Sequence, residues 1–261
     1  MVPEDKLSEV IELASRLLSG NERAFYQRVW RTDLETYRSR LRAIQFEGLK
    51  NVLDAGCGMG QWTLCLSGLN HHVCAIDSLA NRVETVRGIL QELGVSNVEL
   101  KVQSIEALEF PDKHFDGIFC YQVLMMADFQ KSLREFYRVL KPGGKVYLST
   151  NGLGWYIFNL VTPYQPAEDY DPRQMAIDAL ENTLAFWEEG VRRPGKQLVI
   201  QSNHLKKEME AIGFENLLVG GEGTLRLDPN PNLSVERFFA SQQYGLENVY
   251  EVLAWRLGFV G

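Results

Sequence analysis

Apolar residues recur at intervals of three and four near the start of the chain, from Leu7 to Leu18. This spacing places them on one face of a helix, and Gly20 follows where such a helix would end. A second helix is predicted over about residues 22–41, where polar and apolar positions continue to alternate with a helical period. The chain therefore begins with two predicted helices.

From Lys50 the pattern changes to short apolar runs that alternate with longer amphipathic segments. Such alternation is typical of parallel strands joined by helical crossovers, so we expect an α/β fold with a doubly wound, mostly parallel sheet. The predicted strands are 51–55, 72–76, 98–102, 115–120, 145–149, 216–219 and 249–255. The predicted helices among them are 61–67, 79–93, 129–140 and 204–212.

Residues 151–201 interrupt this rhythm and are rich in aromatic side chains. The pattern divides the chain into an N-terminal helical cap (1–49), a core (50–150), an inserted lid (151–201) and a C-terminal part that completes the sheet (202–261). Ligands of such sheets bind at the carboxyl ends of the strands. We therefore expect the cap and the lid to cover that edge, with Tyr26 and Trp30 facing Trp155 and Tyr164.

The composition narrows the class of protein. The 261 residues include 27 Lys and Arg against 34 Asp and Glu, which gives a net charge of −7. An acidic chain lacks the basic footprint that neutralises phosphates, so nucleic acid is a disfavoured partner. No apolar run reaches the roughly 18 residues of a membrane span, and the charged first residues do not form a signal-peptide core. A cytoplasmic location is the expectation.

Four cysteines (Cys57, Cys65, Cys74 and Cys120) form no close pair in the sequence and have no partner histidines at metal-ligand spacing. Neither a disulfide framework nor a metal site is predicted from them. Clustered carboxylates are also absent, apart from the pair Asp169 and Asp171. We therefore expect the activity to need no metal.

The most informative stretch is VLDAGCGMG, residues 52–60, where a predicted strand runs into glycines at every second position. The spacing Gly-x-Gly-x-Gly does not match the dinucleotide fingerprint Gly-x-Gly-x-x-Gly. Asp54 precedes the loop, and its charge would oppose a pyrophosphate but suit an ammonium or sulfonium group. Asp77 ends the next strand, where it can accept hydrogen bonds from a ribose diol. A ligand with a ribose, a positive charge and no phosphate is indicated, and S-adenosylmethionine has all three properties.

Together with FDGIFCYQVLMMADFQKSLREFYRVLKPGGKVYLS at residues 115–149, this block resembles the class I S-adenosylmethionine-dependent methyltransferase family. The resemblance is strong over residues 50–150 and weaker over 204–219. It implies a Rossmann-like fold with a seven-stranded sheet, in which residues 50–150 bind S-adenosylmethionine and no nicotinamide cofactor.

The resemblance also implies roles for particular residues. Gly56, Cys57 and Gly58 would line the methionine part of the cofactor, Asp54 would hold its amino group, and Asp77 would take the ribose hydroxyls. The remaining residues expected at the cofactor are Tyr26, Ser78, Leu79, Ser104, Ile105, Cys120, Tyr121 and Gln122. Relatives usually have an acid at the position of Ser104, so adenine recognition is the weakest part of this set. Met125 and Met126 stand where many relatives have an acid–base pair, and they give an adaptable apolar surface instead.

Methyl transfer from a sulfonium needs mainly alignment and exclusion of water, and a general base only for some acceptors. No catalytic base can be assigned from the sequence, and the candidates are Tyr26, Tyr164, residues 169–171 and His204. The leading interpretation is a methyltransferase acting on an O, N or C atom of a small or medium-sized organic acceptor. The first alternative is a tRNA methyltransferase that uses arginines 28, 31, 38 and 42. The second is a cofactor-binding module without catalysis.

Overall fold

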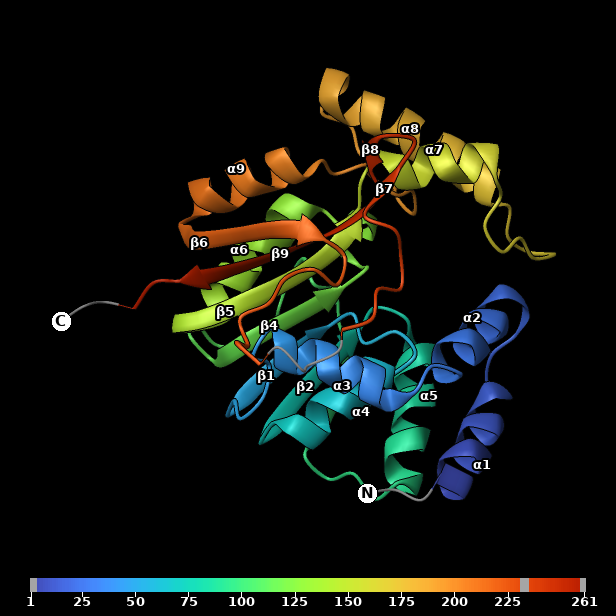
Figure 1. The fold of residues 1–261 in the computed structure, drawn as a ribbon, viewed down its shortest axis with the longest axis vertical. Coiled ribbons are helices and arrows are strands. Elements are labelled where there is room, and N and C mark those ends of the chain that lie inside the picture. Colours follow the sequence, from blue (N-terminus) through green and yellow to red (C-terminus); the bar gives the residue numbers. More distant parts are fainter. Residues whose placement is uncertain (1–3, 231–234, 259–261) are drawn as a thin grey trace.

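The computed structural model describes residues 4–230 and 235–258, and seven strands form one sheet in the order β3-β2-β1-β4-β5-β9-β6 (Figure 1). Their bounds are β1 Asn51–Ala55, β2 His72–Asp77, β3 Val98–Val102, β4 Phe115–Tyr121, β5 Leu140–Asn151, β6 Phe214–Gly221 and β9 Val249–Arg256. Strands β1 to β5 pair in parallel, whereas β9 is antiparallel to both β5 and β6. The predicted fold class is confirmed.

The chain direction across the sheet reverses between β1 and β4. From β1 the chain winds outward through β2 to β3, and it then returns to place β4 on the other side of β1. In such sheets the crevice for a ligand opens at this reversal, beside the carboxyl ends of the two strands. The loop after β1 lies at this position, so the topology puts residues 56–60 where sheets of this kind bind their ligands.

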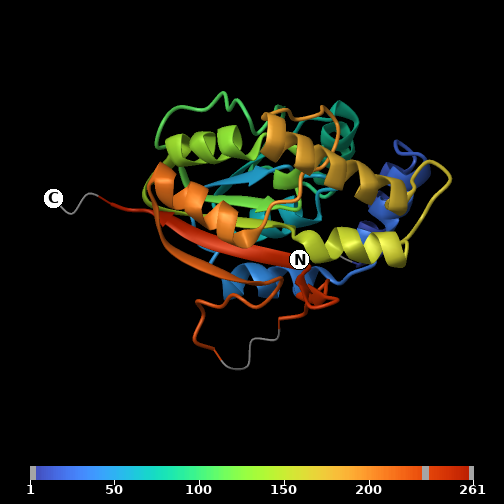
Figure 2. The same cartoon turned by 90° about the horizontal axis from the view of Figure 1, so that it is seen from above.

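Helices cover both faces of the sheet because the strand side chains alternate in direction. Val52 and Phe119 belong to one hydrophobic core, and Leu53 and Cys120 to the other. The first core lies under α1 (Glu4–Ser15), α2 (Gly20–Trp30), α3 (Leu34–Ala43), α4 (Gln61–Leu69) and α5 (Ala80–Glu92). The second lies under α6 (Phe129–Val139) and α9 (Ser202–Ile212). Figure 2 shows α3 on one side of the sheet and α6 and α9 on the other.

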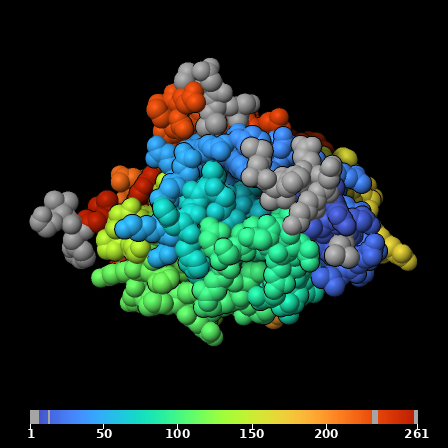
Figure 3. Space-filling model, turned by 90° about the horizontal axis from the view of Figure 1, so that it is seen from below, coloured from blue at the N-terminus to red at the C-terminus, as the bar shows by residue number. Residues whose placement is uncertain are grey.

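The N-terminal helices extend the first face. Helix α1 contacts α5, and Figure 3 shows the dark-blue N-terminal segment beside the green-teal stretch of the chain. Glu22 at the start of α2 reaches the same helix, where its carboxylate pairs with Arg82 at 3.0 Å. The cap is therefore attached to the core sheet through α5.

The prediction of one helix over residues 22–41 is wrong, because two helices occupy this stretch. Helix α2 ends at Trp30 and α3 begins at Leu34. Asp33 separates them, and its side chain accepts a hydrogen bond from the backbone N–H of Glu35 at 3.0 Å. An aspartate in this N-cap position satisfies a donor that a continuing helix would use internally. Of the arginines named for the tRNA alternative, Arg28 consequently lies on α2, and Arg38 and Arg42 on α3.

Replacing Asp33 with alanine is expected to lower the free energy of unfolding by about 1 kcal/mol, because the first turn of α3 loses its capping acceptor. Asp33→Asn keeps an acceptor oxygen and should stay close to the original stability. Chemical denaturation of the two variants measures the difference. Equal destabilisation by both changes would show that the cap contributes nothing specific.

The inserted segment contains α7 (Leu153–Val161) and α8 (Pro172–Glu189), which pack on each other beyond the end of β5 (Figure 1). A short hairpin of β7 (Gln242–Gln243) and β8 (Leu246–Glu247), which the sequence pattern did not predict, contacts α7. A 3₁₀ turn, η1 (Leu124–Met126), follows β4. Within the described residues, no helix is long and apolar enough to cross a membrane.

Candidate cofactor and acceptor site

The loop between β1 and α4 turns through three glycines that all have positive φ angles: 93° at Gly56, 52° at Gly58 and 86° at Gly60. Residues with a Cβ rarely adopt this conformation. At Gly56 a Cβ would also lie 2.3 Å from Cγ2 of Val123, whereas at Gly58 it would meet only a backbone oxygen at 4.0 Å. The backbone at Gly58 is thus open to the approach of a ligand.

Asp77 fixes the shape of this loop from the end of β2. One carboxylate oxygen accepts a hydrogen bond from the Gly58 N–H at 3.0 Å, and the other accepts from the Leu79 N–H at 2.9 Å. A carboxylate offers about four acceptor positions, so each oxygen can still accept a further hydrogen bond. Asp77 is therefore able to brace the loop and to receive a diol at the same time.

Asp54 lies beneath the loop and is almost completely buried. Its Oδ2 accepts a hydrogen bond from the Thr63 hydroxyl at 2.6 Å. Burial, opposed by this hydrogen bond and assisted by the charge of Asp77, raises the pKa of the Asp54 carboxyl to about 7. The charge of Asp77 acts on the Asp54 carboxyl, and no cationic side chain is bonded to either acid in the described structure. This arrangement suits a ligand that brings its own positive charge.

Of the residues predicted to lie near adenosine, some are exposed and some are buried. Ser78 and Leu79 are exposed at the end of β2, and Ser104 is exposed after β3, where its hydroxyl accepts from the Glu106 N–H at 3.2 Å. Ile105 is buried in the core of the α6 face. Gln103, which the sequence analysis did not single out, donates its N–H to the Asp77 carbonyl at 2.9 Å. Its side-chain Oε1 is buried and has no hydrogen-bond partner among the described residues.

The end of β4 places its three predicted residues differently. Cys120 is fully buried in the core of the α6 face. The Tyr121 hydroxyl donates to Glu222 at 2.8 Å, so this side chain belongs to the α3 face. Gln122 has a positive φ angle of 58°, and its side-chain amide donates to the Ser149 hydroxyl at 2.9 Å. Only Gln122 lies past the end of the strand, and direct cofactor contacts from these three residues stay a prediction.

Helix α2 lies against the glycine loop, because the indole N–H of Trp30 donates to the Met59 carbonyl at 3.1 Å. Tyr26 is fully buried one turn earlier, with its ring 6.1 Å from that of Trp30. Within the described chain the Tyr26 hydroxyl has no hydrogen-bond partner. Burial, with a smaller contribution from the charge of Glu12, raises the pKa of this hydroxyl and keeps it protonated.

Contact between the cap and the insertion is made by other residues than those predicted. The Asn21 N–H donates to the Asp169 carboxylate at 2.8 Å. The ring of Trp155 packs on Tyr164 and Phe239 instead of on Tyr26 or Trp30 in the described structure. The expected facing of these aromatic pairs is therefore wrong, although the two segments meet at the same end of the sheet (Figure 1). The contact is made by polar residues, Asn21 at the start of α2 and Asp169 in the insertion. The spacing of aromatic residues in the sequence did not indicate this contact.

The proposed bases are mostly engaged elsewhere. Asp169 accepts the Asn21 N–H, and Asp171 caps α8 by accepting from the Arg173 N–H at 2.8 Å. His204 lies on α9 with its ring 4.4 Å from that of Trp187. A catalytic base stays unassigned.

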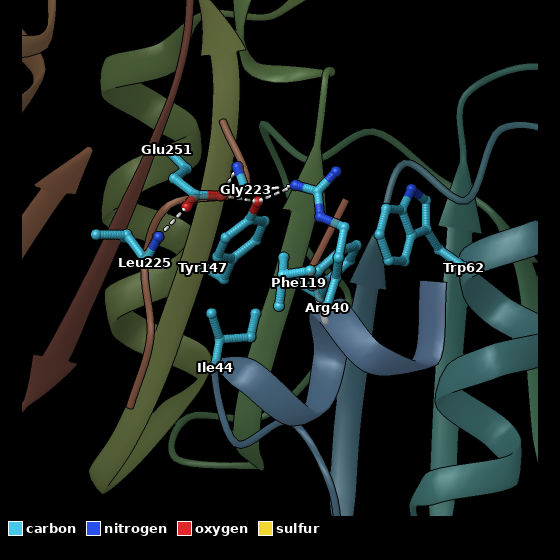
Figure 4. Close-up of a pocket in the computed structure, with 9 residues that line it drawn as sticks. Arg40, Ile44, Trp62, Phe119, Tyr147, Gly223, Leu225 and Glu251 are labelled. Atoms are coloured by element: carbon cyan, nitrogen blue, oxygen red, sulfur yellow. Dashed lines mark hydrogen bonds and ion pairs between the residues drawn. The ribbon is translucent and has the colours of Figure 1, made fainter. Parts of the chain in front are cut away.

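A buried ionic network lies beside the site on the α3 face of the sheet, and no motif in the sequence indicated its members. Arg40 on α3 pairs with Glu222 and lies 3.6 Å from Glu251, and all three are almost fully buried. Figure 4 shows the Arg40 guanidinium between the Trp62 ring and the Tyr147–Glu251 pair. The cavity there has a volume of about 10 Å³, which is room for about one water molecule. This pocket is therefore part of the packing and not a place for a cofactor.

Both carboxylates of this network hold backbone that crosses the α3 face. Glu251 accepts from the N–H groups of Gly223, Thr224 and Leu225, at 3.1, 2.9 and 2.6 Å. Glu222 accepts from the N–H groups of Phe238 and Phe239 at 2.9 and 3.3 Å. The network ties the segment after β6 to the sheet and reaches the cofactor edge through Tyr121.

Residues 52–144 match the family model described as "Methyltransferase domain". This chain therefore contains a methyltransferase domain of the class I, S-adenosylmethionine-dependent family, as the sequence predicted, and S-adenosylmethionine is the cofactor of that domain. The matched residues begin in β1 and end in β5, so they include the glycine loop, Asp77 and the end of β4.

Among curated proteins, the chain is 36% identical over 100 residues to a demethylmenaquinone methyltransferase of Listeria welshimeri, which covers 37% of this chain and 42% of that protein. It is 38% identical over 98 residues to the uncharacterized methyltransferase YcgJ of Bacillus subtilis, covering 37% of this chain and 39% of that protein. The matched part is thus about two fifths of the length of these curated relatives.

Solved structures share the fold over most of the chain. A geranyl diphosphate methyltransferase in complex with S-adenosylmethionine aligns with a TM-score of 0.60 at 16% identity, over 87% of this chain and 86% of that one. The [4+2]-cyclase SpnF aligns with a TM-score of 0.56 at 18% identity, over 84% and 78%. At these identities the likeness establishes the fold alone, and the second neighbour shows that the fold serves more than one chemistry.

Proposed function

We propose that this protein transfers the methyl group of S-adenosylmethionine to a small or medium-sized organic acceptor with a mainly apolar body. One observation carries the proposal: inside the segment that matches the methyltransferase domain, Asp54 and Asp77 flank a glycine loop that lacks the dinucleotide spacing. The cofactor supplies an activated methyl group, and the protein aligns it with the acceptor and excludes water.

Each element of the site has a task in this proposal. Asp77 receives the ribose diol on the acceptor positions left free by Gly58 and Leu79. Asp54 faces the amino group of the methionine part, and the attraction of that cation favours the ionised carboxylate. The unpartnered Oε1 of Gln103 accepts from the exocyclic amine of adenine, a task that the usual acid performs in relatives. The buried Tyr26 hydroxyl, on the helix that contacts the glycine loop through Trp30, is a further donor without a partner among the described residues.

The insertion supports an apolar acceptor. Apolar side chains on or next to α7 and α8 remain exposed, and Leu184 and Trp187 are 59% and 48% accessible. Exposed apolar side chains of this kind are suited to contact with an organic ligand. The name of the Listeria relative points to a quinone-like aromatic acceptor. We extend this substrate class to the present chain as part of the proposal.

The two alternatives have less support. Residues 151–201 contain seven acids and four bases, which opposes a tRNA lying across the insertion. Arg42 is engaged with Glu35, and the four arginines are not on one helix: Arg28 lies on α2, Arg31 follows its end, and Arg38 and Arg42 lie on α3. A binding module without catalysis keeps the same cofactor contacts and differs only in turnover.

The test is incubation of the protein with methyl-labelled S-adenosylmethionine and, in separate reactions, a demethylated naphthoquinol, total tRNA, and organic and aqueous fractions of a cell extract. Label is expected in the quinol or in the organic fraction. Label in tRNA would favour the first alternative. Tight cofactor binding without transfer to any fraction would favour the binding module.

A further inference from the structure

Three potential metal ligands meet on β2 and β3, away from the glycine loop, and are called here the β2–β3 cluster: His72, Cys74 and Glu99. His72 and Cys74 are two residues apart on a strand, so their side chains lie on the same face. Glu99 is the register partner of Cys74 on β3. The Cys74 Sγ lies 3.6 Å from Nε2 of His72 and 3.5 Å from Oε2 of Glu99, and all three ligand atoms lie within 4.8 Å of one another.

These separations are close to those of a tetrahedral zinc site. Bonds of about 2.3 Å to sulfur and about 2.0–2.2 Å to nitrogen and oxygen, at the tetrahedral angle, put neighbouring ligand atoms about 3.3–3.6 Å apart. Both separations that involve Cys74 already have this value. The remaining one, between His72 and Glu99, requires movement of at most about 1.5 Å, and the Glu99 side chain is exposed. We infer that the β2–β3 cluster binds a divalent, thiophilic metal ion such as zinc.

The surroundings of the cluster fit three protein ligands and one water. Cys74 is buried at the base of the cluster and Glu99 is exposed at its rim, so the fourth position faces solvent. The Lys101 Nζ lies 3.1 Å from Oε1 of Glu99. The other carboxylate oxygen, Oε2, is the one that lies near the Cys74 thiol. Contacts of this kind orient a ligating carboxylate. The positive groups nearby are Lys101, Lys141 and, when it is protonated, His114. Their charge is offset by the Glu99 carboxylate and by a metal-bound Cys74 thiolate.

Metal binding at this place releases one proton. Burial, and then the Glu99 carboxylate, raise the pKa of the Cys74 thiol to about 12, so the metal-free thiol is protonated at neutral pH. The ion displaces this proton to water when the sulfur becomes a thiolate ligand. The sequence spacing gave no indication of the site, because the third ligand comes from a strand that pairs only in the folded sheet.

The expected consequence is structural. Strand β3 is at the edge of the sheet, and the metal would link it to β2. Asp77 follows Cys74 by three residues, about 10 Å along the strand, so the ion would lie outside the reacting centre. A metal here would stabilise β2, which ends in Asp77, and β3, which Gln103 follows, and would leave the methyl-transfer chemistry to the cofactor. This inference is independent of the proposed function.

Titration of the metal-free full-length protein with Co²⁺ tests the inference, because cobalt bound to a thiolate gives a charge-transfer band in the near ultraviolet. We expect saturation at one Co²⁺ per chain, displacement of the band by one equivalent of Zn²⁺, and a higher melting temperature with Zn²⁺. Cys74→Ser should abolish the band. His72→Ala and Glu99→Gln should weaken Co²⁺ binding at least tenfold.

Cys65→Ser is the matched control, since Cys65 is also buried but lies on α4 and contacts the Leu34 carbonyl. It should keep the band and the stoichiometry. Binding of S-adenosylmethionine to each variant verifies folding, and Glu99→Gln, at an exposed position, provides a test that does not disturb the core. A protein that gives no thiolate band, or a band that survives Cys74→Ser, would overturn the inference.

Discussion

Replacing Arg40 with methionine is expected to lower the free energy of unfolding by about 3–5 kcal/mol, the usual cost of removing one partner from a buried ion pair. The change leaves the carboxylates of Glu222 and Glu251 in a buried environment without their cation. It also removes the guanidinium that lies 4.6 Å from the centre of the Phe238 ring. Denaturant unfolding followed by tryptophan fluorescence measures the effect.

Arg42→Met provides the control, because Arg42 lies on the same helix and its pairs with Glu35 and Glu47 are exposed. Exposed pairs contribute about 0–1 kcal/mol, so this variant should stay close to the original stability. Because Glu222 and Glu251 hold the backbone at 223–225 and 238–239, hydrogen exchange in those segments should accelerate in Arg40→Met alone. A loss of less than 1 kcal/mol in Arg40→Met would contradict the assigned role of the network.

Replacing Asp77 with alanine is expected to weaken S-adenosylmethionine binding by about 1.5–3 kcal/mol, which is about a 10- to 150-fold increase in Kd. The variant loses the acceptor for the ribose diol and also the brace on the Gly58 and Leu79 N–H groups. Calorimetric titration with the cofactor and with its demethylated product measures the change. The original protein should show no binding of NAD under the same conditions.

Asp112→Ala is the control for this prediction, because Asp112 is an exposed acid that pairs with Arg138 away from the glycine loop. It should bind the cofactor as the original protein does. The thermal stability of Asp77→Ala separates a lost ligand contact from a lost fold. If a folded Asp77→Ala protein kept its affinity, Asp77 would not be the ribose ligand.

Local sequence determined the elements of the core and the loop between them. Strands 51–55 and 98–102 were predicted with the bounds that the structure shows. The first is a short, mostly apolar and buried run, and in the second apolar and polar residues alternate with the period of a strand. Gly56, Gly58 and Gly60 were identifiable because their backbone conformation admits almost no other residue. Asp77 was identifiable because it stands at the end of a strand whose neighbour carries the loop. Each of these signals lies within a few residues of the feature that it specifies.

The break between α2 and α3 was not recovered, although Asp33 is a local signal. The helical period of the apolar positions continues across residues 31–33, and it was given more weight than the preference of aspartate for an N-cap. The choice between the two depends on whether Trp30 can reach the Met59 carbonyl and Leu41 the core. Those contacts exist only when both helices are packed on the sheet.

Only the tertiary structure decided the long-range groupings. Arg40 and Glu222 are 182 positions apart, and Cys74 and Glu99 are joined by the register of β2 and β3. A charged residue in a sequence is expected at the surface, because nothing local reveals a partner that offsets the cost of its burial. The sequence thus specified the cofactor loop, which is built from neighbouring residues. The sheet order specified which distant side chains share a buried space, because burial and pairing are properties of the packed chain.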